Sequence, residues 1–155
     1  MSENRVIGKD NRLPWNMPAD WKNFREITEG KTFIMGRNSY LAPDKLLSTS
    51  RSIILSHSVI PDLCEKCLRV QDWEAALALV KGEPEVFILG GQRIFEQALS
   101  FANYIYLTLI HARISGDAFF PEIDGSKWQL VRSRSFRRDR ENPYDYSFLE
   151  YTRSV

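Results

Sequence analysis

The sequence predicts an α/β fold: a single domain with a mixed, mostly parallel central sheet, flanked by helices, and an antiparallel hairpin at the C-terminal end. Three observations support this. The chain has 155 residues, which suits one domain with its own core. Before residue 104, short apolar runs alternate with amphipathic segments. After it, only strand-like runs follow. We therefore expect residues 1–155 to form one domain.

The parallel strands are expected at residues 32–35, 52–55, 67–70 and 86–89, each a short run of apolar or β-branched residues. Three helical segments accompany them. One covers residues 20–28 and stops at Gly30, one begins at Asp72, and one covers residues 92–99 after a pair of glycines. This alternation is typical of βαβ units, whose strands run parallel.

Strands alone are expected in the last part of the chain, at residues 104–112, 128–137 and 145–152, where Gly, Pro, Asp and Asn separate them. These strands should close the sheet in the antiparallel sense. Residues 1–5 are polar, so no strand is expected ahead of the first loop. That is unusual for an alternating α/β chain.

Composition describes an ordinary globular protein, with 43% hydrophobic residues, 26% charged residues and a net charge of +1. The arginine cluster at 132–140 is interrupted by Asp139 and followed by Glu141, so we expect no nucleic-acid partner. The apolar runs are too short to cross a bilayer, and no leader sequence opens the chain. We expect a cytoplasmic monomer without membrane contact.

Cys64 and Cys67 form a C-x-x-C, a spacing found in redox couples and in half of a zinc site. A zinc site needs further ligands. There is no second C-x-x-C, and the two histidines, His57 and His111, lie on separate segments. We therefore expect incidental thiols and no metal.

Asp20 stands in the first turn of an expected helix that Pro18 suits as a start. Asp20 and Phe24 are four residues apart and share a helix face, with Trp15 and Trp21 nearby in sequence. One interpretation is that Asp20 is a first-turn acid whose negative charge the helix dipole stabilises. The other is a carboxylate among apolar rings, which can form paired hydrogen bonds to a flat, amidine-like edge such as that of a pterin.

Two turns could hold phosphate groups, because each leads from an apolar strand into a helix start. Gly90 and Gly91 form one of them, and the turn from Gly36 through Arg37 forms the other. Arg37, with Ser56 and His57 after the next strand, could bind the 2′-phosphate of NADPH. The alternative to phosphate binding is that Arg37 is a solvated surface charge and His57 an exposed loop residue.

Four segments, RVIGKDNRLPWNMPAD, TFIMGRNSY, VFILGGQRIFEQAL and ISGDAFFP, followed by RENPYDYSFLEY, occur in the order seen in bacterial dihydrofolate reductases. The chain resembles that family over nearly its whole length. The resemblance implies reduction of 7,8-dihydrofolate to 5,6,7,8-tetrahydrofolate with NADPH, by hydride transfer to pterin C6 and protonation at N5. It also implies inhibition by antifolates.

The same resemblance implies site residues. Asp20 would hold the pterin, Thr108 would brace Asp20, and Trp15 would order a neighbouring water. Trp21 and Phe24 would enclose the substrate, with Leu47 opposite. The loop from residue 8 to 15 would close over the nicotinamide. The residues implied for cofactor binding are Leu13, Gly36, Arg37, Asn38, Ser39, Ser56, His57, Leu89, Gly90, Gly91, Gln92, Arg93, Ile94 and Phe95.

The chain departs from the family pattern in three places. Family members open with an apolar, central strand, which has no counterpart here. A start assigned at an internal methionine, a shortened segment or a natural truncation would explain this. Ser50 stands at the position of the arginine that holds the folate glutamate tail, and Arg51 next to it could substitute. Phe95 stands where bacterial members often have tyrosine.

Two other functions stay open. One is an NADPH-dependent reductase of the same fold with a different heterocyclic substrate, as in riboflavin synthesis; Asp20 following a tryptophan argues against it. The other is a non-catalytic NADPH-binding remnant, suggested by the absent strand and by the altered 41–51 segment.

Overall fold

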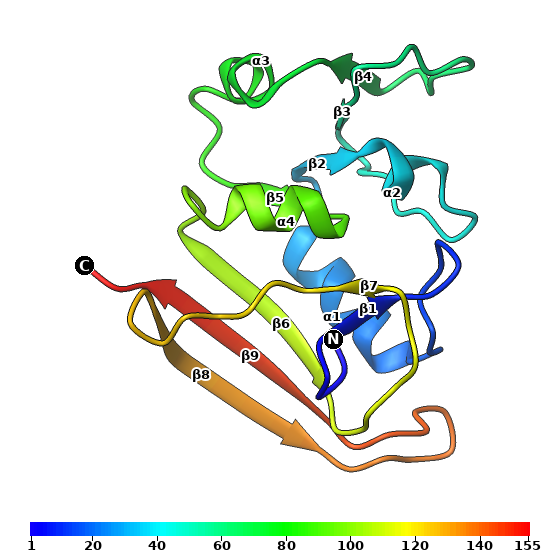
Figure 1. Ribbon diagram of the computed structural model, residues 1–155, viewed down its shortest axis with the longest axis vertical. Coiled ribbons are helices and arrows are strands. Elements are labelled where there is room, and N and C mark those ends of the chain that lie inside the picture. Colours follow the sequence, from blue (N-terminus) through cyan, green and yellow to red (C-terminus); the bar gives the residue numbers. More distant parts are fainter.

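A computed structural model describes residues 1–155 and confirms the α/β fold class (Figure 1). The four helices are α1 (Pro18–Thr28), α2 (Arg37–Leu41), α3 (Trp73–Leu79) and α4 (Gln92–Ala98). The strands are β1 (Val6–Gly8), β2 (Thr32–Gly36), β3 (Ser52–Leu55), β4 (Cys67–Val70), β5 (Val86–Ile88), β6 (Tyr104–Ile110), β7 (Ala118–Phe119), β8 (Trp128–Phe136) and β9 (Tyr146–Arg153).

The parallel sheet has the strand order β4-β3-β2-β5. Every residue of β2 and β3 is buried, as expected for strands covered on both faces. On one face Phe33 and Met35 pack with Phe24 of α1. On the other face Ile34 packs with Ala76 of α3 and with Ile94 of α4. The helices therefore enclose this sheet from both sides.

Local signals account for the helix ends. Pro18 occupies the first turn of α1, where a missing N–H costs nothing. Gly30 follows that helix with φ of +72°, a conformation that favours glycine. Asp72 caps α3 by accepting a 2.8 Å hydrogen bond from the backbone N–H of Ala75. These features account for both ends of α1 and for the start of α3.

The C-terminal strands form a separate antiparallel sheet with the order β6-β9-β8. We expected them to close the parallel sheet, and this detail was wrong, because no strand joins β5 to β6. A third pairing, of β1 with β7, was not expected from the sequence. Ser2 forms a single parallel bridge with Ile110, at the end of β6.

Cys64, in the turn before β4, forms a disulfide bond with Cys67, the first residue of β4. The expectation of incidental thiols was therefore wrong. Their Cα atoms are 5.0 Å apart, within the range that a disulfide needs, and the redox-couple interpretation of the C-x-x-C spacing was the available signal. No group of three or more His, Cys, Asp or Glu side chains could hold a metal ion.

No helix of the protein is both long enough and apolar enough to cross a membrane.

Candidate active site

Asp20 lies half-buried in the first turn of α1. Its Oδ1 accepts a hydrogen bond of 2.7 Å from the hydroxyl of Thr108 on β6. These two residues are 88 positions apart in the chain, so the fold alone brings them together. A carboxylate held in this way is fixed in orientation while its second oxygen stays available to a ligand.

The amino group of Met1 lies beside the same pair. It donates a hydrogen bond of 2.6 Å to the backbone carbonyl of Thr108. Burial lowers the pKa of this ammonium from 8.0 to about 6, and the negative charge of Asp20 acts in the opposite direction. An amino group that titrates near pH 6 therefore lies within the electrostatic influence of the Asp20 carboxylate.

Trp15 carries the only buried side-chain polar atom without a hydrogen-bond partner, its indole Nε1. A buried N–H in this condition is usually satisfied by a ligand or a water molecule. Trp21 and Phe24 are half-buried on α1, and Phe24 packs edge-on against Phe33 at 5.8 Å between ring centroids. Leu47 is 37% exposed, so its side chain is accessible to a ligand.

The two glycine turns lie side by side. The backbone N–H of Gly36 donates a 2.7 Å hydrogen bond to the carbonyl of Gly90, and the Gly90–Gly91 peptide is cis. A Cβ atom at Gly90 would come within 3.0 Å of the Phe95 ring, and one at Gly36 within 2.8 Å of Ile94. Side chains would disrupt this junction, so the glycines keep two bare backbone segments in contact.

The hydroxyl of Ser39 borders this junction, because it lies 3.6 Å from the Cβ position of Gly91. Arg37 and Asn38, at the start of α2, are exposed, as is His57 after β3. Ser56 is buried, and its hydroxyl donates to the carbonyl of Ser58. Leu89 and Gln92 are half-buried beside the glycines, and Arg93 is exposed.

Two backbone contacts hold the loop between β1 and α1. The backbone N–H of Asp10 donates a 3.0 Å hydrogen bond to the Asp117 carboxylate. The backbone N–H of Leu13 donates a 2.9 Å hydrogen bond to the Asp44 carboxylate. Asp44 belongs to the same segment as Leu47, so the loop is tied to the segment expected to face the substrate. Sequence reasoning missed both acids, because nothing local marks them.

Arg51 has partners away from Asp20. Its guanidinium donates to the carbonyl of Leu79, at 2.6 Å, and to the carboxylate of Glu83. Burial alone would raise the pKa of Glu83, but hydrogen bonds from Arg51 and Thr32 and the charge of Arg51 together lower it. Nη2 of Arg51 is thus already engaged, so binding of the folate tail by Arg51 would have to compete with these contacts.

Sequence reasoning also missed Arg69, which lies on β4 opposite Ile54. Its guanidinium donates a 2.9 Å hydrogen bond to the carbonyl of Ser56. A positive charge therefore stands beside the segment expected to bind the 2′-phosphate. Its position in the third expected strand, residues 67–70, next to the strand that precedes Ser56, was the available signal.

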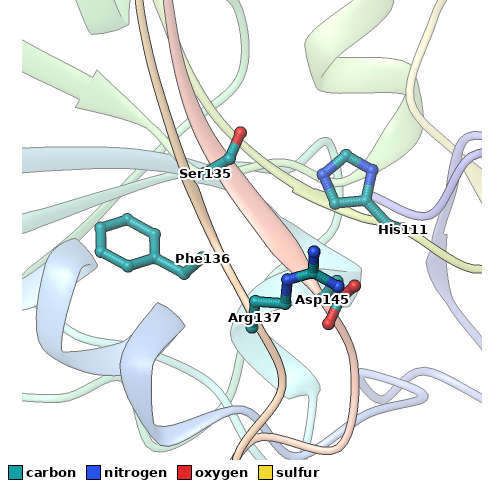
Figure 2. Close-up of a pocket in the computed structure, with 5 residues that line it drawn as sticks. All are labelled: His111, Ser135, Phe136, Arg137 and Asp145. Carbon is teal, nitrogen blue, oxygen red and sulfur yellow. The ribbon is translucent and has the colours of Figure 1, made fainter.

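A separate cavity of about 260 Å³ lies against the antiparallel sheet, lined by His111, Ser135, Phe136, Arg137 and Asp145 (Figure 2). His111 Nε2 is 2.7 Å from the hydroxyl oxygen of Ser147, which in turn is 2.8 Å from that of Ser135. Phe136 points away from the other four side chains in this view. None of the expected site residues lines the cavity.

The comparisons with known proteins agree with this geometry. A sequence profile described as dihydrofolate reductase matches residues 1–153. The chain belongs to the dihydrofolate reductase family. The dihydrofolate reductase of Bacillus subtilis is 37% identical over 151 residues, covering 97% of this chain and 89% of that protein. That of Staphylococcus haemolyticus is 37% identical over 153 residues, covering 99% and 92%.

A solved structure gives the same result for the fold. Dihydrofolate reductase from Enterococcus faecalis, in complex with NADP(H) and RAB-propyl, matches with a TM-score of 0.86 and 32% identity. The match covers all of this chain and 93% of that one. Membership of the dihydrofolate reductase family thus rests on sequence and on structure independently.

Proposed function

We propose that this chain reduces 7,8-dihydrofolate to 5,6,7,8-tetrahydrofolate with NADPH. The observation that carries the proposal is the Asp20 carboxylate, held by Thr108 in the first turn of α1, the helix that also carries Trp21 and Phe24. A carboxylate is the side chain suited to the flat, nitrogen-rich edge of a pterin, because it accepts two parallel hydrogen bonds. Antifolates that present a similar edge are expected to compete for the same group.

In this proposal Asp20 orients the pterin, and Thr108 fixes the carboxylate so that little freedom is lost on binding. Trp21 and Phe24 enclose the ring, and Leu47 contacts it from the opposite side. The free Nε1 of Trp15 holds the water through which N5 receives its proton. The negative charge of Asp20 favours protonation of the heterocycle.

The residues at the two glycine turns fit NADPH. Gly36, Gly90 and Gly91 provide bare backbone where a phosphate group must approach closely, and the hydroxyl of Ser39 stands beside them. When bound, the cofactor supplies the hydride for pterin C6. The other residues that we propose to hold it are Leu13, Arg37, Asn38, Ser56, His57, Leu89, Gln92, Arg93, Ile94 and Phe95.

The loop from residue 8 to 15 excludes water in this proposal by closing over the reacting rings. Its two anchors, Asp117 and Asp44, belong to different segments, so closure depends on both. The unit of activity is one chain, because Asp20, Thr108 and both glycine turns come from the same chain.

The proposal is tested by measuring NADPH oxidation with dihydrofolate, alongside NADPH binding measured by fluorescence. We expect turnover that antifolates inhibit. Turnover only with the aminopyrimidine intermediate of riboflavin synthesis would favour the other reductase reaction. NADPH binding without turnover of either substrate would favour a non-catalytic remnant.

A second measurement tests the cofactor site. Arg37→Gln should raise KM for NADPH by roughly tenfold and leave KM for NADH unchanged, since only NADPH carries the 2′-phosphate that a charged hydrogen bond would hold. Arg25→Gln, an exposed change on α1, is the matched control. An equal effect of Arg37→Gln on both cofactors would contradict the assignment.

A further inference from the structure

Cys64 and Cys67, the two cysteines of the disulfide bond, differ in exposure. Cys67 is 5% exposed and packs in the core with Phe33 and Ile54 of the parallel sheet. Cys64 is half-buried, in a turn beside β4, which is the edge strand of that sheet (Figure 1). Glu65, the next residue in the turn, is exposed. A thiol in solution therefore reaches the Sγ atom of Cys64 more readily than that of Cys67.

The turn that contains Cys64 also contacts α2. The backbone N–H of Cys64 donates a hydrogen bond of 3.1 Å to the hydroxyl of Tyr40. The backbone carbonyl of Cys64 accepts a hydrogen bond of 2.9 Å from the N–H of Cys67. The disulfide bond thus closes the same short turn that places the Cys64 N–H against Tyr40.

Tyr40 anchors α2. It is the only buried residue of this five-residue helix, and its side chain packs in the same core cluster as Cys67. No side-chain hydrogen bond caps the first turn of the helix. A helix of this length is held by tertiary contacts, because its own hydrogen bonds are too few. A contact that fixes Tyr40 therefore also fixes α2.

The residues before Tyr40 on α2 are Arg37, Asn38 and Ser39, which we propose to bind NADPH. The hydroxyl of Ser39 stands beside the glycine turn at residues 90–91. One hydrogen bond and one short helix therefore lie between the disulfide bond and the cofactor residues. This link to NADPH rests on the proposed function, whereas the exposure of the cysteines does not.

The other side of the disulfide bond is held independently of it. β4 pairs with β3 over four residues, beginning with Cys67 opposite Ser52. Arg69 of β4 also donates a 2.9 Å hydrogen bond to the carbonyl of Ser56. None of these contacts involves the sulfur of Cys64. Opening of the disulfide bond should therefore leave Cys67 in place and free the turn that contains Cys64.

We propose that Cys64 is a thiol-exchange site: a small thiol such as glutathione forms a mixed disulfide there, and opening of the Cys64–Cys67 bond weakens NADPH binding through Tyr40. The thiolate attacks the Sγ atom of Cys64, so that a bond forms between these two sulfurs and the bond to Cys67 breaks. The electron pair stays on the Sγ atom of Cys67, which takes up a proton from water.

A second small thiol completes the reaction. Its thiolate attacks the sulfur of the bound small thiol, which releases a small-molecule disulfide and leaves Cys64 as a thiolate that takes up a proton. Two small thiols are thereby oxidised, and the protein disulfide is reduced to two thiols.

The mixed disulfide changes the packing beside Tyr40. Cys64 contacts the core cluster that contains Tyr40, and a tripeptide on its sulfur is far larger than the Sγ atom of Cys67 that it replaces. The turn moves outward to make room, and the hydrogen bond from the Cys64 N–H to Tyr40 is lost. A buried hydroxyl without its partner is costly, so α2 is held less firmly.

The first measurement locates the adduct. The oxidised full chain is incubated with millimolar glutathione, quenched with N-ethylmaleimide and digested with trypsin for mass spectrometry. Trypsin cleaves after Lys66, so Cys64 and Cys67 fall in different peptides. We expect glutathione on the Cys64 peptide and N-ethylmaleimide on the Cys67 peptide.

The second measurement is NADPH binding, followed by fluorescence before and after the exchange. We expect Kd for NADPH to rise roughly three- to tenfold, which corresponds to the loss of about one hydrogen bond. The variant with both Cys64→Ser and Cys67→Ser is the control, and its Kd should not respond to glutathione.

Tyr40→Phe tests the route. It removes the hydroxyl that accepts from Cys64 and keeps the ring in the core. The adduct should form as before, but glutathione should change Kd for NADPH by less than about twofold, because the two changes act on the same hydrogen bond. Circular dichroism and the melting temperature show whether this variant folds. If it does not fold, hydrogen exchange at the α2 amides of the parent chain, expected to be faster in the adduct, decides the route.

Glutathione on Cys67, or no adduct at either cysteine, would overturn the exchange site. An unchanged Kd for NADPH in the adduct would overturn the coupling, and so would an equal response in Tyr40→Phe. The adduct is detected without cofactor or turnover. A failure of the proposed reductase activity appears in the oxidised chain before any thiol is added, so the two failures are distinguishable.

Discussion

The hydroxyl of Thr108 donates a 2.7 Å hydrogen bond to the carboxylate of Asp20 and so joins β6 to the first turn of α1. The backbone carbonyl of Thr108 also accepts a hydrogen bond from the amino group of Met1. Thr108 therefore contacts both Asp20, the residue proposed to bind the substrate, and the first residue of the sequence. The proposed chemistry therefore depends on how well a single strand position is fixed.

Asp20→Asn keeps the shape of the side chain and removes its charge. We expect kcat/KM for dihydrofolate to fall by roughly 100- to 10,000-fold, because protonation of the substrate loses its electrostatic support. Glu26→Gln on the exposed face of α1 is the control and should be neutral. Steady-state assays measure both, and equal activities for the two variants would exclude the role of Asp20.

Thr108→Val removes the hydrogen bond to Asp20, whereas Thr108→Ser keeps a hydroxyl. A hydrogen bond to a charged group contributes about 1.5–3 kcal/mol, so we expect the valine variant to lose roughly 10- to 100-fold in kcat/KM. The serine variant should recover most of this loss. Similar losses in both variants would mean that packing, not the hydrogen bond, matters at this position.

Asp117→Ala removes the acceptor that holds the backbone of Asp10. We expect kcat to fall on the order of tenfold, because the 8–15 loop closes less often. Stability should change by less than about 0.5 kcal/mol, since the contact is exposed. Glu122→Ala, on an exposed position nearby, is the control. An unchanged kcat would argue against a role for this anchor.

Stability should rise with pH between about 6 and 8. The ammonium of Met1 has a pKa of about 6 in the fold, below its ordinary value of 8.0, so the unfolded chain binds more protons in this interval. The gain is at most about 3 kcal/mol. Urea unfolding at pH 6 and pH 8 measures it. Acetylation of the amino group should remove the difference, and its persistence would assign it to other groups.

Reduction of the disulfide should lower the free energy of unfolding by about 2 kcal/mol, as a short closed loop implies. Thermal unfolding with and without dithiothreitol measures the effect. The variant with both Cys64→Ser and Cys67→Ser should be insensitive to the reductant. A reductant-sensitive double variant would show that the effect arises elsewhere.

Much of the fold was predictable because its signals are local. Residues 52–55 and 67–70 were expected as strands and have these same bounds, since buried parallel strands appear as short apolar runs. The pairing of β1 with β7 was not predictable. Both strands are very short, and the residues that pair between them lie more than 100 positions apart in the chain.

The candidate site shows the same division. The helix position and aromatic neighbours of Asp20 left two interpretations open, and the family resemblance supplied the proposed roles of both Asp20 and Thr108. Asp44 and Asp117 could not be found, because each acts on the backbone of a distant loop and leaves no pattern around itself. The partners of Arg51 likewise come from residues 79 and 83, which only the folded chain brings near.

The hydrogen bond from Leu13 to Asp44 has a consequence for ligand binding. Leu13 belongs to the flap proposed to cover the nicotinamide, and Asp44 belongs to the stretch proposed to meet the substrate. A ligand that orders either element lowers the entropic cost of ordering the other. The two ligands should therefore bind with positive cooperativity, and Asp44→Ala should bring their affinities closer to independence.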